Sequence, residues 1–557
     1  MDKRLSIALL LTAIIVAVTP ILFPTPRRAT SPAPAVSAQK SAPTVVQKAQ
    51  PTPEQVAPLS VAPLADSAAA APAAATTRAR EEITTVATAR SSYQFTSLGA
   101  APVSVTFRDY KNLASAGGQV SLQSPGQPLL QYSLVLNGTV VPLSNISFEP
   151  VSSTNVAGDR ILTYRATVNG IGVVISYDVV PDRYVVRIGG SVEGVTGQAY
   201  LLVSLPSALP ATEADTLSDL RTLSYSFKPK NDHAQGIPFA KMDPGEKRLE
   251  AGPLTWAAVR NKYFVVGLVN PEGSAFREMN LVGGPRTSKI ATTASATVVK
   301  EIEDGKFSFD MYAGPQQSTE LLAMGRDFDH VNPYGWSFLQ PVVNPIAALC
   351  LKALLWVHDN LKVSYGWVLI IFGVFIRIAL WPLNQSAMRS SMKMQEIQPR
   401  LAEVQKKYKD KPEKQREEMM KVYKEAGASP FTALSGCLPM LIPMPVLFAL
   451  FFVFQNTIEF RGVPFLWLTD ISIKDPIYIL PVLMGVSMYI LSWIGLRNAP
   501  PNPQAKMMMY MFPVMMTFVL ANMASGLNLY YTAQNIAALP QQWLLARERL
   551  KARKAAG

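Results

Sequence analysis

The sequence predicts a multi-domain membrane protein with an N-terminal anchor helix, an all-β sandwich and an α-helical bundle of five core transmembrane helices. The chain has 557 residues, too many for one domain, and its longest apolar runs come after residue 365. Between residues 92 and 320 the apolar residues instead occur in short alternating runs, the pattern of antiparallel strands. The formal net charge of +13 suits an anionic membrane surface or nucleic acid, and the apolar runs favour the membrane.

The segment 1–23 places Lys3 and Arg4 before an apolar run, so it is either an uncleaved transmembrane anchor or a cleaved signal peptide. The nearest small-residue cleavage site lies around Ala38, far beyond the apolar run, which favours an anchor with its N-terminus inside. Residues 24–91 are rich in Ala, Pro, Ser and Thr and poor in aromatic residues. We expect this stretch to be a disordered linker, because it has too little apolar surface to bury.

Residues 92–320 are expected to form the β-sandwich domain. Two stretches, Gln131–Leu143 and Leu162–Ile175, alternate around an Asn-Gly pair, which is a strong hairpin signal. An enzyme of envelope glycans is one alternative for this domain, but it shows no convincing carboxylate pair, and His233 is its only histidine. A scaffold or docking module is therefore the favoured interpretation.

The helical part begins with an interfacial amphipathic helix at 333–360, with Trp356 near its end. Apolar runs then predict transmembrane helices at 365–383, 434–455, 476–496, 507–522 and 527–546. Residues 384–426 carry eleven lysines and arginines against seven acidic residues and are expected to form a cytoplasmic helical hairpin. The tail 547–557 is also basic, so the positive-inside rule places both termini in the cytoplasm.

A single charge, Arg377, lies inside the first of these apolar runs. An arginine at membrane depth costs at least about 2.5–3.5 kcal/mol and usually faces a bundle interior or a water-filled cavity. Arg377 is therefore a functional-site hypothesis. Two other interpretations stay open: the side chain reaches headgroups beyond Pro382, or it binds the anion of a secondary transporter. A transporter of that kind needs inverted repeats, which five spans do not supply.

The last predicted span is unusually polar. Asn528, Tyr531 and Asn535 recur at i, i+3 and i+7, on one helical face. Such a face either forms hydrogen bonds between helices, which is common in membranes, or lines a wet cavity that also holds Arg377. No nucleotide-binding motif or histidine metal centre is evident, so no cofactor is expected.

Several segments resemble the YidC/Oxa/Alb family of membrane protein insertases. They are FIRIALWPLNQ around Arg377, SGCLPMLIPMPVLFALFFVF, DPIYILPVLMGVSMY and SGLNLYY. The anchor, the large β domain and MYAGP at 311–315 are similar to the Gram-negative form, with a large periplasmic domain. That domain resembles the sugar-mutarotase sandwich but lacks the histidines such an enzyme needs.

The resemblance implies a non-enzymatic insertase and chaperone of the bacterial inner membrane. Its hydrophilic groove, open to the cytoplasm, would hold Arg377, with Asn528, Tyr531 and Asn535 in its lining, and the arginine would capture acidic tails of nascent membrane proteins. Their apolar segments would slide into lipid along the third and fifth spans. The residues matching this slide are Met444, Leu447, Phe451, Met515 and Val519.

The resemblance also implies partners. These are nascent membrane proteins, the lipid bilayer, and the ribosome, which the basic tail and cytoplasmic hairpin would contact; the SecYEG translocon is a further candidate. Two positions depart from the family pattern: Gly373 stands where relatives often carry a hydroxyl residue, and Asn522 where some carry an aromatic residue.

Overall fold

The computed structural model describes most of the chain after residue 80. The described residues are 81–114, 118–123, 126–154, 160–195, 197–286, 290–332, 340–409, 411–425, 444–497 and 503–556. The predicted anchor at 1–23 and most of the linker at 24–91 lie outside them, as do residues 333–339 and the proline-rich start of the predicted span at 434–455.

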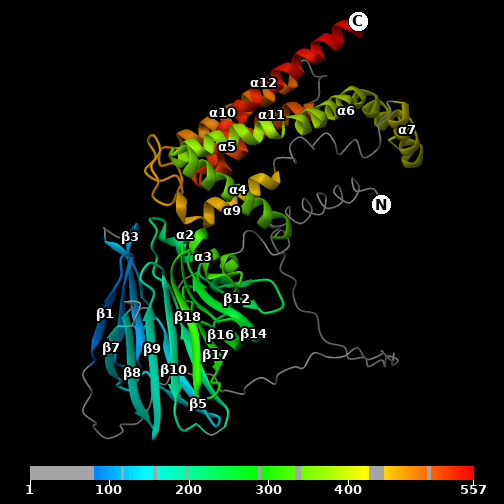
Figure 1. Cartoon of the computed structure of the whole chain (residues 1–557). Helices are drawn as coiled ribbons and strands as arrows, with labels where there is room; N and C mark the ends of the chain where they lie inside the picture. The colour runs from blue at the N-terminus through cyan, green and yellow to red at the C-terminus, as the bar shows by residue number, and fades with distance from the viewer. Residues whose placement is uncertain are drawn as a thin grey trace, which may run out of the picture. The chain divides into compact units, whose positions relative to one another are not determined.

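The β domain consists of two antiparallel sheets (Figure 1). The smaller sheet has the order β1-β2-β3-β4, formed by Ile83–Ala87, Ser91–Thr96, Ala101–Lys111 and Gln119–Gln123. The larger sheet has fourteen strands in the order β6-β5-β11-β17-β16-β14-β15-β18-β10-β9-β8-β7, with β12 and β13 attached to β14. Its strands are β5 Gln131–Leu136, β6 Thr139–Pro142, β7 Glu149–Thr154, β8 Arg160–Val168, β9 Ile171–Val179, β10 Val185–Val192, β11 Ala199–Leu205, β12 Ser224–Pro229, β13 Gln235–Pro238, β14 Lys247–Arg260, β15 Phe264–Val269, β16 Phe276–Gly283, β17 Ala294–Glu301 and β18 Lys306–Pro315.

Aromatic side chains from both sheets meet in one core. The ring of Phe95 on β2 lies 4.6 Å from that of Tyr177 on β9, and the ring of Phe107 on β3 stacks on Phe264 of β15 at 5.4 Å. All four side chains are fully buried. Aromatic residues bury large areas and pair favourably beyond that area, so these contacts hold the small sheet against the large one.

Both predicted hairpins are confirmed. β5 pairs with β6 across Asn137 and Gly138, and β8 pairs with β9 across Asn169 and Gly170. All four turn residues have positive φ angles, between 49° and 81°. A type I′ turn needs two such residues, and Asn-Gly adopts this conformation at low cost.

The predicted boundary between linker and β domain is wrong. The domain begins within the segment 24–91, because β1 pairs along its length with β2 and buries Val86. The stretch Ile83–Ala87 is rich in β-branched residues, which favour strands, and this signal outweighs the low aromatic content of the residues before it.

The helical part follows α3 (Ser318–Met324) and the short turn η2 (Phe328–Val331). Helix α12 packs against α10, α5 and α9, while α11 packs along α10, and α4 packs against α9 and α5. The helices are α4 Gln340–Leu361, α5 Tyr365–Ala379, α6 Trp381–Lys407, α7 Pro412–Glu425, α9 Met444–Asn456, α10 Ile479–Leu496, α11 Pro503–Leu520 and α12 Ser525–Ala556. Helices α6 and α7 lie in the predicted hairpin segment and contact each other through Leu401 and Tyr423.

Within the described part of the chain, two helices are long and apolar enough to cross a membrane, at Val342–Leu361 and Ile479–Leu496. The apolar helices Tyr365–Ala379, Pro445–Asn456 and Lys506–Leu520 are shorter. Helix α5 nevertheless continues into α6 without losing its helical path, since the Leu380 amide donates to Ile376 O and the Asn384 amide donates to Leu380 O. The apolar face of α4 includes the exposed Leu349 and Trp356.

Several helix boundaries differ from the sequence prediction, and two of them have a clear physical cause. Helix α10 begins at Ile479 rather than 476, because the buried Asp475 carboxylate accepts from the amides of Ile477 and Leu480, and Tyr478 adopts a left-handed conformation. A carboxylate at this position satisfies otherwise unpaired amides at a helix start.

The basic tail is not separate from the last span. Helix α12 runs through it to Ala556. No proline or glycine interrupts the helix after Pro540, and the guanidinium of Arg547 lies 3.4 Å from the ring centroid of Trp543, one turn earlier. A cation over an indole ring is an attractive contact, which supports helix beyond the apolar stretch.

The loop between α9 and α10 is anchored in the β domain. Arg461 Nε lies 2.7 Å from Glu213 Oε1, and both side chains are at most 5% exposed. Arg461 Nη2 also donates to Lys111 O and Thr212 O. Ile458 of the same loop belongs to the β-domain core. Breaking a buried ion pair by removing one partner is strongly destabilising, so this loop and the β domain are firmly joined.

The core of the β domain offers a stability prediction at adjacent glycines of β10. A Cβ added to Gly190 would overlap Val174 O and the Phe307 ring, whereas one added to Gly189 would lie 3.4 Å from Ser176 Oγ. We expect Gly190→Ala to destabilise the protein by about 1–3 kcal/mol through overpacking. Thermal unfolding of the purified full chain measures this effect. Gly189→Ala is the matched control, and equal melting temperatures for the two variants would contradict the packing argument.

Candidate functional site

Arg377 lies in the last turn of α5, and its side chain faces α12. The residue is 8% exposed. Its Nη2 donates to Gln541 Oε1 at 2.9 Å, and Gln541 Nε2 in turn donates to Trp381 O at 3.1 Å. Gln541 therefore fixes the guanidinium while adding no negative charge.

The guanidinium has no negative partner within the described ranges. No carboxylate there forms an ion pair with Arg377, and its buried Nε has no hydrogen-bond acceptor. A buried donor left without an acceptor costs about 1–3 kcal/mol, and more when it is charged. The site thus retains a positive charge and unused hydrogen-bonding capacity.

Asn384 supplies a second unused donor. It is 2% exposed, and its Nδ2 has no acceptor among the residues that the structure describes. Arg377 and Asn384 are seven residues apart on a continuous helical path, so they share one face. An acceptor oxygen at either position would satisfy one of these donors.

The polar residues of α12 have different partners. Asn528 is fully buried, and its Nδ2 donates to Leu520 O at the end of α11, while its Oδ1 lacks a donor. Asn535 Nδ2 donates to Ser487 Oγ on α10 at 3.1 Å. Tyr531 is 8% exposed and its ring lies 5.5 Å from that of Tyr530. Helix–helix hydrogen bonds therefore account for Asn528 and Asn535, and neither is bonded to Arg377.

Gly373 lets α5 approach α12 closely. A Cβ at this position would lie 3.1 Å from Tyr530 O and 3.3 Å from Tyr530 Cδ2. Those distances are tighter than ordinary van der Waals contact, so a hydroxyl residue here would require Tyr530 to move. The departure from the family pattern at Gly373 therefore goes with tight packing one turn before Arg377.

The proposed slide residues lie on two helices with different exposure. On α11, Met515 is 40% exposed and Val519 is 48% exposed. On α9, Leu447 and Phe451 are half-buried and pack on the core of the bundle. Met444 is the first residue of α9, and its side chain lies outside the described set.

Three residues of this region were missed by sequence reasoning: Gln541, Asn384 and Ser487. Gln541 follows Gln534 by seven residues on α12, and Asn384 follows Arg377 by the same spacing. The seven-residue spacing places each pair on one helical face, so it could have indicated Gln541 and Asn384 from the sequence. In the described residues there is also no cluster of three His, Cys, Asp or Glu side chains placed to hold a metal ion.

Comparisons with known proteins address the whole chain. Residues 356–553 match the family model of the 60Kd inner membrane protein, and residues 83–348 match that of the YidC periplasmic domain. The membrane protein insertase YidC of Pelodictyon phaeoclathratiforme is 32% identical over 469 residues, which cover 75% of this chain and 77% of that protein. The two family matches confirm the predicted combination of a large periplasmic β domain and a helical membrane core.

Solved structures give more distant likenesses. A crystal structure of an active YidC insertase is 18% identical, covers 83% of this chain and 92% of its own, and has a TM-score of 0.34. A putative mutarotase from Salmonella typhimurium is 9% identical, covers 42% of this chain and 90% of its own, and has a TM-score of 0.27.

The Ser487–Asn535 bond joins α10 to α12 and is open to a direct test. We expect a double-mutant cycle of Ser487→Ala and Asn535→Ala to give a coupling of about 0.6 kcal/mol, a typical value for membrane helices. Reversible unfolding in mixed micelles provides the measurement. A cycle of Asn535→Ala with Thr517→Ala is the control, because Thr517 bonds to Pro513 O of its own helix. Equal coupling in both cycles would argue against the inter-helix bond.

Proposed function

The chain belongs to the YidC family of membrane protein insertases, and on this premise we propose that Arg377 receives the acidic tail of an incoming client protein. Members of this family are not enzymes. They insert nascent membrane proteins and are located in the inner membrane. The proposal concerns the residues that would do the work in this chain, and its central observation is the buried guanidinium with only a neutral partner.

The uncompensated charge of Arg377 supports capture of a carboxylate. Two unit charges about 4 Å apart attract by ~1 kcal/mol in water and by ~4 kcal/mol at an effective dielectric of 20. A client carboxylate at Arg377 Nε would also satisfy a donor that the described chain leaves unused. Had α12 supplied a glutamate in place of Gln541, the site would already be neutral and would hold little attraction for a client.

The apolar part of the client would then move along exposed side chains of α11 and the half-buried face of α9. Met515 and Val519 lie beside other exposed apolar residues of α11, including Phe518 at 74% exposure. Burial of each CH₂ group of the client in lipid contributes about 0.8 kcal/mol. Partitioning on this scale would drive insertion without a nucleotide.

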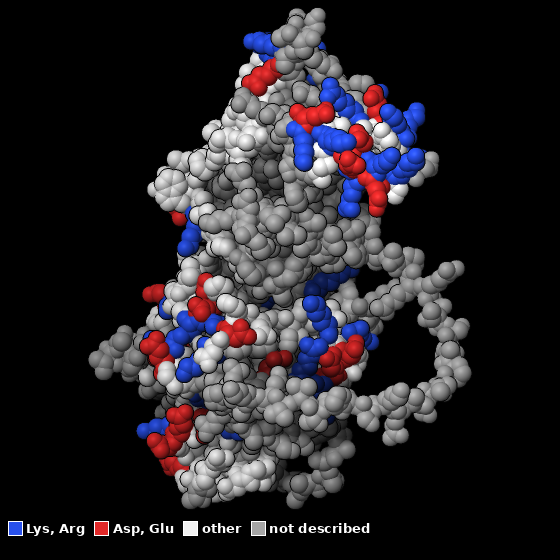
Figure 2. All heavy atoms as spheres, turned by 90° about the vertical axis from the view of Figure 1, so that its right-hand side faces the viewer, with Lys and Arg blue, Asp and Glu red and all other residues white. Residues whose placement is uncertain are grey.

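The basic cytoplasmic elements would meet the ribosome. Lys and Arg side chains lie among acidic ones over α7, where the two signs balance (Figure 2). The basic excess comes from the whole segment 384–426, with eleven Lys and Arg against seven acidic residues, and from the tail, where Arg547 and Lys551 are exposed. Excess basic charge suits contact with RNA phosphates and, by the positive-inside rule, a cytoplasmic location for both termini. The SecYEG translocon remains part of the proposal as a candidate partner.

The charge-capture role predicts an effect that depends on the client. We expect Arg377→Ala to reduce insertion of clients with acidic tails by about tenfold or more, since one charge contact of ~1–4 kcal/mol is lost. Clients whose tail Asp and Glu residues are replaced by Asn and Gln should change far less. Insertion into vesicles reconstituted with the full chain provides the measurement.

The matched control for this experiment is Arg497→Ala, which removes an exposed arginine at the end of α10. It should leave insertion of both client classes unchanged. An equal loss for acidic and neutral clients in Arg377→Ala would overturn charge capture, provided that the variant retains its melting temperature.

The slide predicts where an arrested client lies. We expect a photoreactive amino acid at Val519 or Phe451 to crosslink to the apolar segment of a stalled nascent chain. The same group at Val482 of α10, which is 53% exposed and also apolar, serves as the control and should give at most weak crosslinks. Comparable yields from all three positions would indicate general lipid proximity rather than a path.

A further inference from the structure

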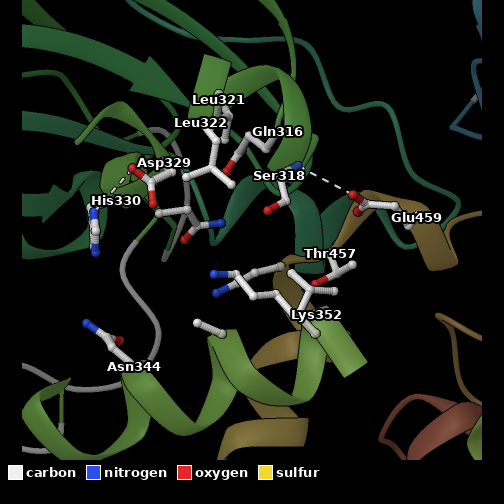
Figure 3. Close-up of a pocket in the computed structure, with 14 residues that line it drawn as sticks. Gln316, Ser318, Leu321, Leu322, Asp329, His330, Asn344, Lys352, Thr457 and Glu459 are labelled. Atoms are coloured by element: carbon white, nitrogen blue, oxygen red, sulfur yellow. Dashed lines mark hydrogen bonds and ion pairs between the residues drawn. The ribbon is translucent and has the colours of Figure 1, made fainter. Parts of the chain in front are cut away.

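A second polar site shares none of the residues around Arg377 and has no part in the capture mechanism. It is a cavity of about 220 Å³ lined by three segments: the end of the β domain, helix α4, and the turn after α9 (Figure 3). Figure 3 shows Asn344 and Lys352 of α4 on the side that faces Ser318 and Asp329, with Thr457 beside Lys352.

Four buried polar atoms without a hydrogen-bond partner line this one cavity. They are Gln316 Oε1, Asn332 Nδ2, Asn344 Oδ1 and Thr457 Oγ1. Gln316, Asn332 and Thr457 are 5%, 8% and 2% exposed. Each unsatisfied buried group costs about 1–3 kcal/mol, so their convergence indicates a space built for a polar occupant.

The orientation of Gln316 is fixed by the β domain. Its Nε2 donates to Asn261 O at 2.9 Å and to Phe264 O at 3.1 Å. Both of these partners are acceptors, so the amide nitrogen is used up and the amide oxygen is left for the cavity. An occupant must therefore donate a hydrogen bond to this oxygen.

Charges of both signs surround the same space. The hydrogen bond with His330 lowers the pKa of Asp329, and the nearby charge of Lys352 lowers it further. Lys352 itself forms no ion pair with any described residue. Glu459 accepts from the Ser318 amide at 3.4 Å, and burial raises the pKa of its carboxyl. Asp329 pairs with His330 at 3.4 Å. One wall thus offers an ammonium that no described carboxylate contacts directly, and another offers a desolvated carboxyl.

Helix α4 places the cavity next to lipid. Asn344, Ala348 and Lys352 recur every four residues on the face that lines it. Leu349 and Trp356, seven residues apart, are 69% and 63% exposed on another face. An exposed leucine and tryptophan on an apolar helix of a membrane protein are typical of contact with the bilayer, with tryptophan favoured at its surface.

We propose that this cavity binds a phosphoethanolamine group, with its phosphate held by Lys352, Asn332 and Thr457 and its primary ammonium held by Glu459 and Gln316. The phosphate accepts hydrogen bonds from the free donors, and the ammonium supplies three N–H donors to the free acceptors. A trimethylammonium group has no N–H and would leave the Gln316 amide oxygen unsatisfied. The bilayer is the nearer source of this group, as the headgroup of phosphatidylethanolamine, and free phosphoethanolamine is the other.

The test uses the full chain in vesicles of equal parts phosphatidylethanolamine and phosphatidylcholine with identical acyl chains. After extraction in mild detergent, mass spectrometry measures the lipid that stays bound. We expect the ethanolamine lipid to be enriched about tenfold over the choline lipid, the effect of one or two charge-assisted hydrogen bonds. Lys352→Gln and Thr457→Val should each remove most of this enrichment.

Lys362→Gln is the matched control, because it removes another lysine just past the end of α4 that does not line the cavity. It should retain the wild-type enrichment.

A second arm adds free phosphoethanolamine to protein in pure phosphatidylcholine vesicles. A raised melting temperature that Thr457→Val abolishes identifies the soluble compound as the source. An unchanged melting temperature, together with enrichment of the ethanolamine lipid, identifies the lipid as the source. Equal retention of both lipids without stabilisation by the free compound would overturn the proposal, as would undiminished enrichment in both cavity variants.

Discussion

The contact between Arg377 and Gln541 is the constraint on which the membrane part depends. It fixes a positive charge between α5 and α12 while leaving that charge uncompensated. Close packing at Gly373 brings the two helices together one turn earlier, and Gln541 returns its amide to Trp381 O at the start of α6. Removing a guanidinium from water is costly, so an ionisable residue inside a membrane segment is a functional-site hypothesis by default.

Arg461 provides the contrast within the same chain. It too is buried, yet it meets the Glu213 carboxylate and two backbone carbonyls, and its guanidinium lies over the Phe264 ring. Desolvation raises the pKa of Glu213, and the nearby Arg461 opposes that rise. The Glu213 carboxylate neutralises the charge of Arg461. Arg461 therefore joins the α9–α10 loop to the β domain and has no capacity for another anion. The two arginines differ in their partners rather than in their burial, and the lack of an acidic partner at Arg377 is the observation that supports its proposed binding role.

The sequence was informative where the signal is local. Asn-Gly pairs located two hairpins, and one charge in an apolar run located Arg377. Contacts between helices were harder to foresee, because spacing on one helix defines a face but not the neighbour that the face meets. Asn528 and Asn535 were grouped with Arg377, yet they bond to α11 and α10, while Gln541 is the residue that reaches the guanidinium. The start of the β domain was misplaced for a related reason, since β1 is specified by pairing with β2 as well as by composition.

An insertase must release what it captures, and this requirement limits how Arg377 can be built. A fully desolvated pair would be difficult to separate, because removal of one partner leaves a bare charge in a medium of low dielectric. A pair in water would attract by only ~1 kcal/mol and would hardly select acidic tails. Arg377 Nη2 already donates to the neutral Gln541 Oε1, whereas Arg377 Nε has no acceptor. A client carboxylate could therefore bond to only part of the guanidinium. A contact of that kind, worth at most ~4 kcal/mol at an effective dielectric of 20, is weaker than the gain from burying about six or more CH₂ groups of the client in lipid, at about 0.8 kcal/mol each. In the proposed mechanism, burial of the apolar segment would therefore draw the client tail away from Arg377.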